Sequence, residues 1–243
     1  MFLGHFGLGL AAKKASPKTS LGTLWIAAQF LDLIWPIFLL LGLERVDIDP
    51  GNTVMTPLDF VSYPLSHSLL GAAGWAFLVA GLYRLIRHNA RGTFVVWALV
   101  LSHWLLDFLV HRPDLPLYPG SDRMFGLGLW NSRLATMFLE GLIFVWGVSI
   151  YRRATRARDA VGTYAFRTLT FFLVLIYLLN VLGPPPPDSR TVAIMDLGQW
   201  VLILWAYWVD RHREPVILSS AVPSADSSAP LIEPPQIDKP DSV

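Results

Sequence analysis

Three polar residues, His103, Asp107 and His111, follow one another at intervals of four in a segment that is otherwise apolar. On a helix this spacing places all three side chains on one face, over roughly 12 Å of the axis. One ion cannot reach all three, but neighbouring pairs at this spacing can share a metal. The alternative is a polar stripe in which His and Asp hydrogen-bond one another at a helix interface. The spacing alone favours neither interpretation.

Further polar residues interrupt other apolar segments. Asp32 and Glu140 each lie inside such a segment, and His67 lies where one begins. A charged residue in a bilayer costs several kcal/mol unless it is paired, faces a cavity or binds an ion. Because the chain has no cysteine, any metal must be held by His, Asp, Glu or backbone oxygen.

The elements that must position these residues are membrane-spanning helices. Of the 243 residues, 53% are hydrophobic and 15% are charged, which excludes a soluble domain, where roughly a quarter are charged. Segments near the length of about 20 residues that a span needs cover 21–43, 66–86, 94–110, 135–151, 164–182 and 192–209. We therefore expect an all-α membrane protein, a bundle of about six transmembrane helices plus a short N-terminal apolar helix. Pro36 predicts a kink in the first span.

Basic residues concentrate in alternate connections between these segments. The connections near 13–18, 84–91, 152–167 and 211–213 hold most of the lysines and arginines, whereas the others hold isolated arginines. This asymmetry predicts six spans with both termini in the cytoplasm. The arginines of 152–158 are expected to contact anionic lipid head groups, so membrane lipid is the expected partner and nucleic acid is not.

The two ends of the chain differ in character. The first residues, MFLGHFGLGLAAKK, have no basic residue before the apolar run and no clear cleavage site, so we expect them to be retained. Residues 214–243 are rich in Ser, Pro, Ala and Asp without apolar periodicity. We expect a transmembrane domain over 1–213 and a disordered cytoplasmic tail over 214–243.

Depth along the helices brings several polar residues to similar levels. At 1.5 Å per residue from the cytoplasmic side, Asp32 and His103 lie at roughly 15–16 Å and Asp107 at roughly 21 Å. His67 and His111 lie at roughly 25–27 Å. These side chains would line a cavity that opens to the extracytoplasmic side.

Two of the polar residues have roles that the residues alone leave open. His5 reaches the level of Asp32 if the first 12 residues re-enter the membrane, but a short apolar N-terminus favours a helix lying flat at the interface. Glu140 could be a general base, a support for a ligand, or the partner of Arg133. Asn180 and Asp196 are expected at helix contacts.

Taken in order, these motifs resemble the bacterial membrane-bound metal-dependent hydrolase family, which includes LexA-binding inner-membrane members. The similarity covers roughly residues 1–120 and rests on His5 in GHFGLGLAAKK, Asp32 in AAQFLDLIWP, His67 in YPLSHSLLG, and His103 with Asp107 in SHWLLDFLVHRPDLPLYPG. The chain departs from the family's Pro-Asp-x-Asp-His around Asp32, where two potential ligands are absent. It also carries its His-Arg pair after the His-x-x-x-Asp motif, so the number of metal ions stays open.

The resemblance implies a site in the bacterial inner membrane whose metal ligands are His5, Asp32, His67, His103 and Asp107. Such ligands suit a divalent ion, zinc above manganese or iron. The ion would lower the pKa of a bound water, and the resulting hydroxide could attack an ester or phosphoester. Glu140 or His111 could carry the proton. A site near the outer leaflet suits a lipid-like, amphiphilic substrate.

Two other classes of function compete with a hydrolase. A transporter or permease could use the same His and Asp groups for proton or ion coupling, although six helices without an internal repeat argue against a secondary transporter. A scaffold protein could use them only to fix helix packing. The sequence favours the hydrolase.

Overall fold

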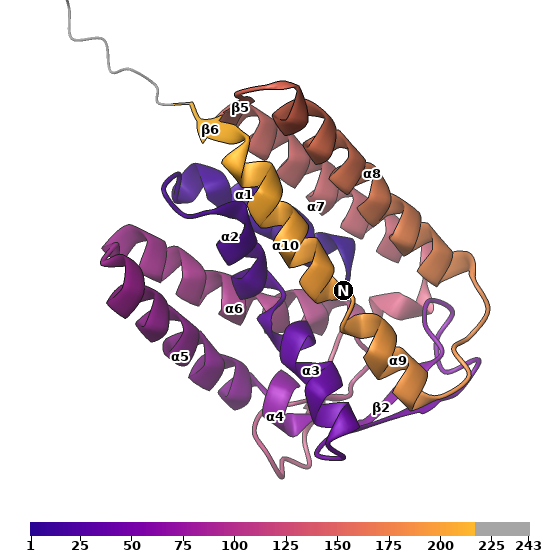
Figure 1. Cartoon of the computed structure of the whole chain (residues 1–243). Helices are drawn as coiled ribbons and strands as arrows, with labels where there is room; N and C mark the ends of the chain where they lie inside the picture. The colour runs from indigo at the N-terminus through magenta and orange to yellow at the C-terminus, as the bar shows by residue number, and fades with distance from the viewer. Residues whose placement is uncertain (217–243) are drawn as a thin grey trace, which may run out of the picture.

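The computed structural model describes residues 1–216 (Figure 1), so most of the tail expected over 214–243 lies outside the described residues. Within them, the expectation of an all-α membrane protein is confirmed. Five segments are long and apolar enough to cross a bilayer, and one bent pair of helices raises the number to six. The five are α5 (Leu69–Arg87), α6 (Ala90–Val110), α7 (Arg133–Ala154), α8 (Ala160–Leu182) and the consecutive helices α9 (Ser189–Asp196) and α10 (Gln199–Arg211).

The first expected span is a broken helix. It consists of α2 (Leu21–Ala28) and α3 (Phe30–Leu40), whose axes differ by 58°. The break lies at Gln29, seven residues before Pro36, where the kink was expected and which lies within α3. The end of a helix leaves backbone carbonyls without intrahelical partners. One of them, the carbonyl of Ala28, accepts a hydrogen bond from Nδ1 of His103 at 2.8 Å.

The N-terminal helix α1 (Leu3–Ala15) lies inside the bundle and packs along α7. The interpretation of a helix lying flat at the interface is therefore wrong. Phe6 and Leu10 are fully buried. At the crossing with α7, a Cβ on Gly147 would lie 2.0 Å from the carbonyl oxygen of Gly7. Two glycines thus let the backbones approach closely enough to seat an apolar helix away from lipid.

Short two-stranded sheets close the connections. β1 (Arg45–Ile48) pairs with β2 (Leu58–Ser62), β3 (Leu115–Pro116) with β4 (Met124–Phe125), and β5 (Thr155–Ala157) with β6 (Arg213–Pro215), all antiparallel. In Figure 1, β2 and β5–β6 lie at opposite ends of the bundle. Two single-turn helices, α4 (Pro64–His67) and η1 (Leu129–Asn131), precede α5 and α7. Because β6 pairs with β5, regular structure extends to Pro215.

Candidate metal centre

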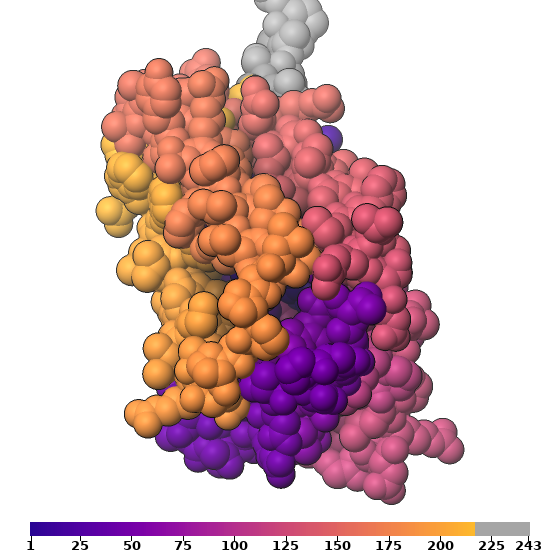
Figure 2. Space-filling model, turned by 90° about the vertical axis from the view of Figure 1, so that its right-hand side faces the viewer, coloured from indigo at the N-terminus to yellow at the C-terminus, as the bar shows by residue number. Residues whose placement is uncertain are grey.

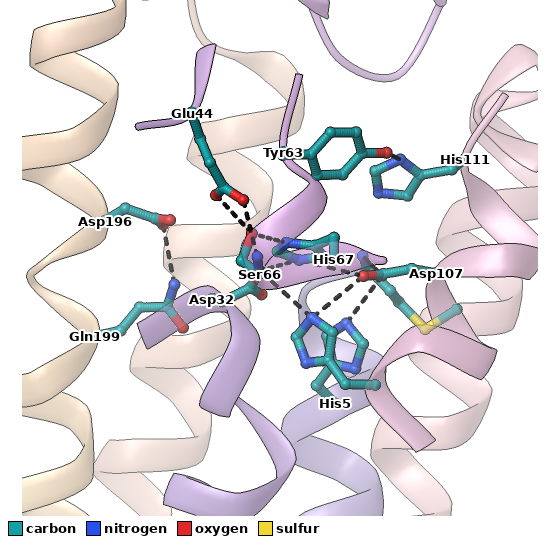
Figure 3. A network of polar contacts seen from close by, with 12 residues as sticks. His5, Asp32, Glu44, Tyr63, Ser66, His67, Asp107, His111, Asp196 and Gln199 are labelled. Atoms are coloured by element: carbon teal, nitrogen blue, oxygen red, sulfur yellow. Dashed lines mark hydrogen bonds and ion pairs between the residues drawn. The ribbon is translucent and has the colours of Figure 1, made fainter. Parts of the chain in front are cut away.

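Three histidines and two aspartates from four helices meet in the interior (Figure 3). They are His5 of α1, Asp32 of α3, His67 of α4, and His103 and Asp107 of α6. Their side chains are almost fully buried, except that of Asp32, which is 20% exposed. These are the five residues that the resemblance implies as ligands, and the fold brings all of them together.

His103 lies at the centre of the group. Its Nδ1 must carry the hydrogen, because the carbonyl of Ala28 can only accept. Its Nε2 then faces two carboxylates, 3.4 Å from Oδ1 of Asp32 and 3.2 Å from Oδ2 of Asp107. This nitrogen is buried and makes no hydrogen bond within residues 1–216. The break between α2 and α3 thereby fixes the tautomer of a histidine on another helix.

His67 is oriented by a relay that ends on a carboxylate. The hydroxyl of Ser66 donates to Oε2 of Glu44 at 2.7 Å, so its oxygen accepts from Nδ1 of His67, also at 2.7 Å. Oε1 of Glu44 accepts two backbone N–H groups at the start of α4, which holds the carboxylate in place. Nε2 of His67 is left facing Oδ1 of Asp32 at 3.3 Å and Oδ2 of Asp107 at 3.7 Å.

His5 completes the group from the N-terminal helix. Its Nε2 lies 3.1 Å from Oδ1 of Asp107, and its ring stacks on that of His103 with centroids 3.7 Å apart. The amino group of Met1 contacts the same oxygen of Asp107. Burial of α1 against α7 is therefore what places an imidazole beside α6.

The arrangement fits a divalent cation. The atoms form two overlapping groups, His5–His103–Asp107 and Asp32–His67–His103, and within each the ligand atoms lie within 4.8 Å of one another. As neutral imidazoles with hydrogen on Nδ1, His67 and His103 present lone pairs to carboxylate oxygens. Acceptors that face acceptors in a buried site repel unless a proton or a metal cation lies between them, and a metal cation can serve all of these contacts at once. Support of ligating imidazoles by a carbonyl or a carboxylate relay is also typical of metal sites.

His111 lies next to this group and has an acidic partner of its own. Its Nδ1 lies 2.9 Å from Oδ1 of Asp114, and the hydroxyl of Tyr63 donates to the same oxygen at 2.8 Å. Burial and the charge of Asp114 raise the pKa of Tyr63, which therefore keeps its hydrogen. The ring of His111 packs against Trp130 with centroids 4.0 Å apart. Its orientation is thus fixed on all sides but that of the cavity.

Glu140, on α7, supports the start of α1. Its Oε2 accepts the backbone N–H of Phe2 at 2.8 Å and that of Gly4 at 3.4 Å. The expected alternative of pairing with Arg133 is not observed, because that guanidinium donates to the carbonyl of Val54. A carboxylate at a helix N-terminus stabilises the helix end, so Glu140 helps to place His5.

A cavity of about 140 Å³ adjoins the centre. Asp32, His67 and Asp107 line one side, and His111 and Glu140 line it as well. The β1–β2 connection, β2, η1 and α8 also contribute to the wall, with Met55, Phe60, Trp130, Tyr177 and Asn180. Figure 2 shows the surface hollowed where the orange segment after α8 meets the purple β1–β2 segment. The centre therefore has a route to the outside of the bundle.

A family model described as YdjM inner membrane protein matches residues 1–183. The chain belongs to the YdjM inner membrane protein family. This confirms the family expected from the motifs and supports the location in a membrane. The match includes His5, Glu140 and every residue of the centre between them. Neither the curated proteins nor the solved structures gave a match.

Sequence reasoning missed the residues that support the centre in this family member. Glu44 and Ser66 carry no metal-ligand spacing, and the role of the Ala28 carbonyl depends on a helix break. Asp196 and Gln199, hydrogen-bonded at 3.0 Å, line the cavity and are not confined to a helix contact. The one available signal was Ser66 next to His67, since a hydroxyl beside a histidine can orient its ring.

Proposed function

We propose that the protein is a membrane-embedded, metal-dependent hydrolase whose substrate is an amphiphilic ester or phosphoester. The observation that carries the proposal is the convergence of His5, Asp32, His67, His103 and Asp107 in a buried group beside a cavity. The fixed Nδ1 hydrogens of two of these histidines support it further.

The five residues would hold the ion through imidazole nitrogens and carboxylate oxygens. This donor set suits zinc, manganese or iron. A divalent cation in this position supplies Lewis acidity toward water and toward a carbonyl or phosphoryl oxygen. The negative charges of Asp32 and Asp107 would compensate the ion, and the ion would offset part of the cost of burying the two carboxylates together, in addition to the amino group of Met1 that already pairs with Asp107.

The remaining polar residues have distinct roles in the proposal. With Nδ1 of His111 held by Asp114, its Nε2 is the atom available to take a proton from water and to return it to the leaving group. We assign this proton transfer to His111. Glu140, whose Oε2 already accepts two N–H groups, positions α1 and with it His5.

The walls of the cavity support an amphiphilic substrate. Met55, Phe60 and Trp130 offer apolar and aromatic contacts beside the polar group. The β1–β2 connection forms part of this wall and lies at the opposite end of the bundle from β5–β6, where arginines concentrate. The amino group of Met1 lies in the centre beside Asp107, so the orientation rests on the basic residues near β5–β6. These predict that the β5–β6 end faces the cytoplasm, and the opening would then lie on the extracytoplasmic side.

Metal content tests the proposal directly. We expect purified wild-type protein to retain a divalent metal measurable by plasma mass spectrometry, and His103→Ala and His67→Ala to lose most of it. His212→Ala is the matched control, since its ring pairs with Asp159 far from the centre, and it should keep the metal. A folded wild type that binds no zinc, manganese or iron on addition would contradict the proposal.

Activity separates the hydrolase from the transporter. A panel of acyl and phosphodiester lipid analogues should be cleaved by the metal-loaded wild type, and His111→Gln should reduce turnover at least tenfold while keeping the metal. Proton flux into liposomes that requires Asp32, without cleavage of any analogue, would instead assign the same residues to transport.

A further inference from the structure

A second, larger cavity lies apart from the metal centre. Its volume is about 510 Å³, and it lies between the end of α5, the end of α10 and the beginning of α2. None of the five proposed ligands lines it. It opens at the end of the bundle where basic residues concentrate, which is the expected cytoplasmic side.

Hydroxyl groups line this cavity in two hydrogen-bonded sets. Thr23 bonds to the hydroxyl of Tyr207 at 2.9 Å and to that of Ser20 at 2.8 Å. Across the cavity, Thr19 bonds to the hydroxyl of Tyr83 at 2.8 Å. Ser20 also caps α2 by accepting from the N–H of Thr23. The wall therefore combines hydroxyl groups with the positive end of a helix, and both favour an oxyanion.

The net charge of the lining is positive. Arg87 and Arg211 both line the cavity and are exposed, and neither has a carboxylate at ion-pair distance within residues 1–216. The one acidic residue of the wall, Asp210, is compensated by Lys13 at 2.8 Å and accepts from Tyr151 at 3.0 Å. Two guanidinium groups are thus left for a ligand, and each guanidinium group can donate two parallel hydrogen bonds to phosphate oxygens.

An apolar surface on α5 adjoins this polar cavity. Ile86 lies at its rim with 73% of its surface exposed, and Leu82 and Leu85 on the same helix are 52% and 71% exposed. In a membrane these side chains face acyl chains. A head group in the cavity could therefore remain attached to chains that lie along α5.

We propose that this cavity is a binding site for a phosphate-bearing anion, either the head group of an anionic phospholipid or a soluble phosphate compound. Arg87 and Arg211 bind the phosphate oxygens. The hydroxyls of Ser20, Thr23 and Tyr207 bind the polar groups next to it. This site is independent of the metal centre and of the proposed hydrolysis.

The experiment uses the full chain in nanodiscs of phosphatidylcholine. One arm adds increasing phosphatidylglycerol, and a second arm adds inorganic phosphate without the anionic lipid. The readouts are the midpoint of thermal unfolding and the lipid retained in native mass spectrometry. The test variant is Arg87→Gln/Arg211→Gln. The control, Arg91→Gln/Arg153→Gln, loses the same charge from outside the cavity lining.

We expect phosphatidylglycerol to raise the unfolding midpoint of the wild type and of the control. The test variant should bind it roughly tenfold or more weakly. Tyr207→Phe, which keeps the ring and removes one hydroxyl, should weaken binding severalfold. A rise with inorganic phosphate alone, lost in the test variant, would support the soluble source. An equal response of test variant and control, or no response of the wild type in either arm, would overturn the proposal.

Discussion

The chemistry of the centre depends on where two histidines carry their hydrogens. Nδ1 of His103 donates to a backbone carbonyl, and Nδ1 of His67 donates to a serine that is itself held by a carboxylate. Both rings are thus prepared to offer Nε2 as a ligand. Residues that support ligands in this way commonly change metal affinity tenfold to a hundredfold, roughly, when they are removed.

Ser66→Ala is therefore expected to weaken metal binding by roughly ten- to a hundredfold, because Nδ1 of His67 loses its acceptor. Competition with a fluorescent zinc chelator measures the affinity. Ser68→Ala is the matched control: Ser68 accepts from the N–H of Gly71 at the start of α5, so its loss should lower thermal stability and leave affinity unchanged. Equal affinities in the two variants would show that the relay has no role in binding.

The sequence predicted which polar residues come together better than it predicted the residues that support them. His103 and Asp107 could be placed together because a helix brings residues four apart to one face. Glu44 could not, since it approaches Ser66 only through the fold of the β1–β2 connection. The carbonyl of Ala28 could not either, because the pattern around Pro36 predicted the bend several residues too late. Local periodicity reports neighbours on one helix and says little about partners from another.

At the scale of elements, the contact between α1 and α7 decides whether the centre is complete. The approach of Gly7 to Gly147 leaves no room for a side chain, since an added Cβ at either position would lie less than 3.0 Å from backbone atoms of the other helix. An apolar segment of this length predicted a helix at the interface. Gly7 is one of several glycines visible in the N-terminal sequence, but its partner Gly147 on α7 lies 140 positions away and could not be identified from the sequence.

Gly147→Ala is expected to displace α1 and withdraw His5 from Asp107. We expect the free energy of unfolding to fall by about 1–3 kcal/mol, as for other overpacked contacts, and metal binding to weaken with it. Thermal unfolding in detergent and metal content measure the two effects. Gly141→Ala, on the same helix with no atom within 4 Å of the added Cβ, should match the wild type. A Gly147→Ala protein with unchanged metal content would show that His5 is dispensable.

At the scale of the whole molecule, the orientation in the membrane determines which compartment supplies the substrate. The expected cytoplasmic position of the N-terminus is not observed, because the amino group of Met1 lies inside the bundle and contacts Asp107. The distribution of basic residues still predicts that the β5–β6 end faces the cytoplasm and that the connection after α6 lies outside. The chain contains no cysteine, so a single introduced thiol reports its own position. Asp122, between β3 and β4, and Arg158, beside β5, are both exposed and lie in connections of opposite expected side.

In spheroplasts, a membrane-impermeant maleimide should label Asp122→Cys without lysis and Arg158→Cys only after lysis. Labelling is read as a mass shift on a gel. The cysteine-free wild type gives the background. The reverse labelling pattern would show that the protein has the opposite orientation in the membrane, with the opening of the 140 Å³ cavity on the cytoplasmic side.

The burial of α1 also has a consequence for biogenesis. Helix α1 finds its main packing partner, α7, only after residues 133–154 have been synthesised and inserted. Contacts of α1 with α2 and α6 can form earlier, but its most extensive packing, with α7, closes a loop of more than half of the chain. Closing so long a loop is slow. We therefore expect the cluster of His5, Asp32, His67, His103 and Asp107 to be completed late in synthesis, and chains that stop before α7 to lack it.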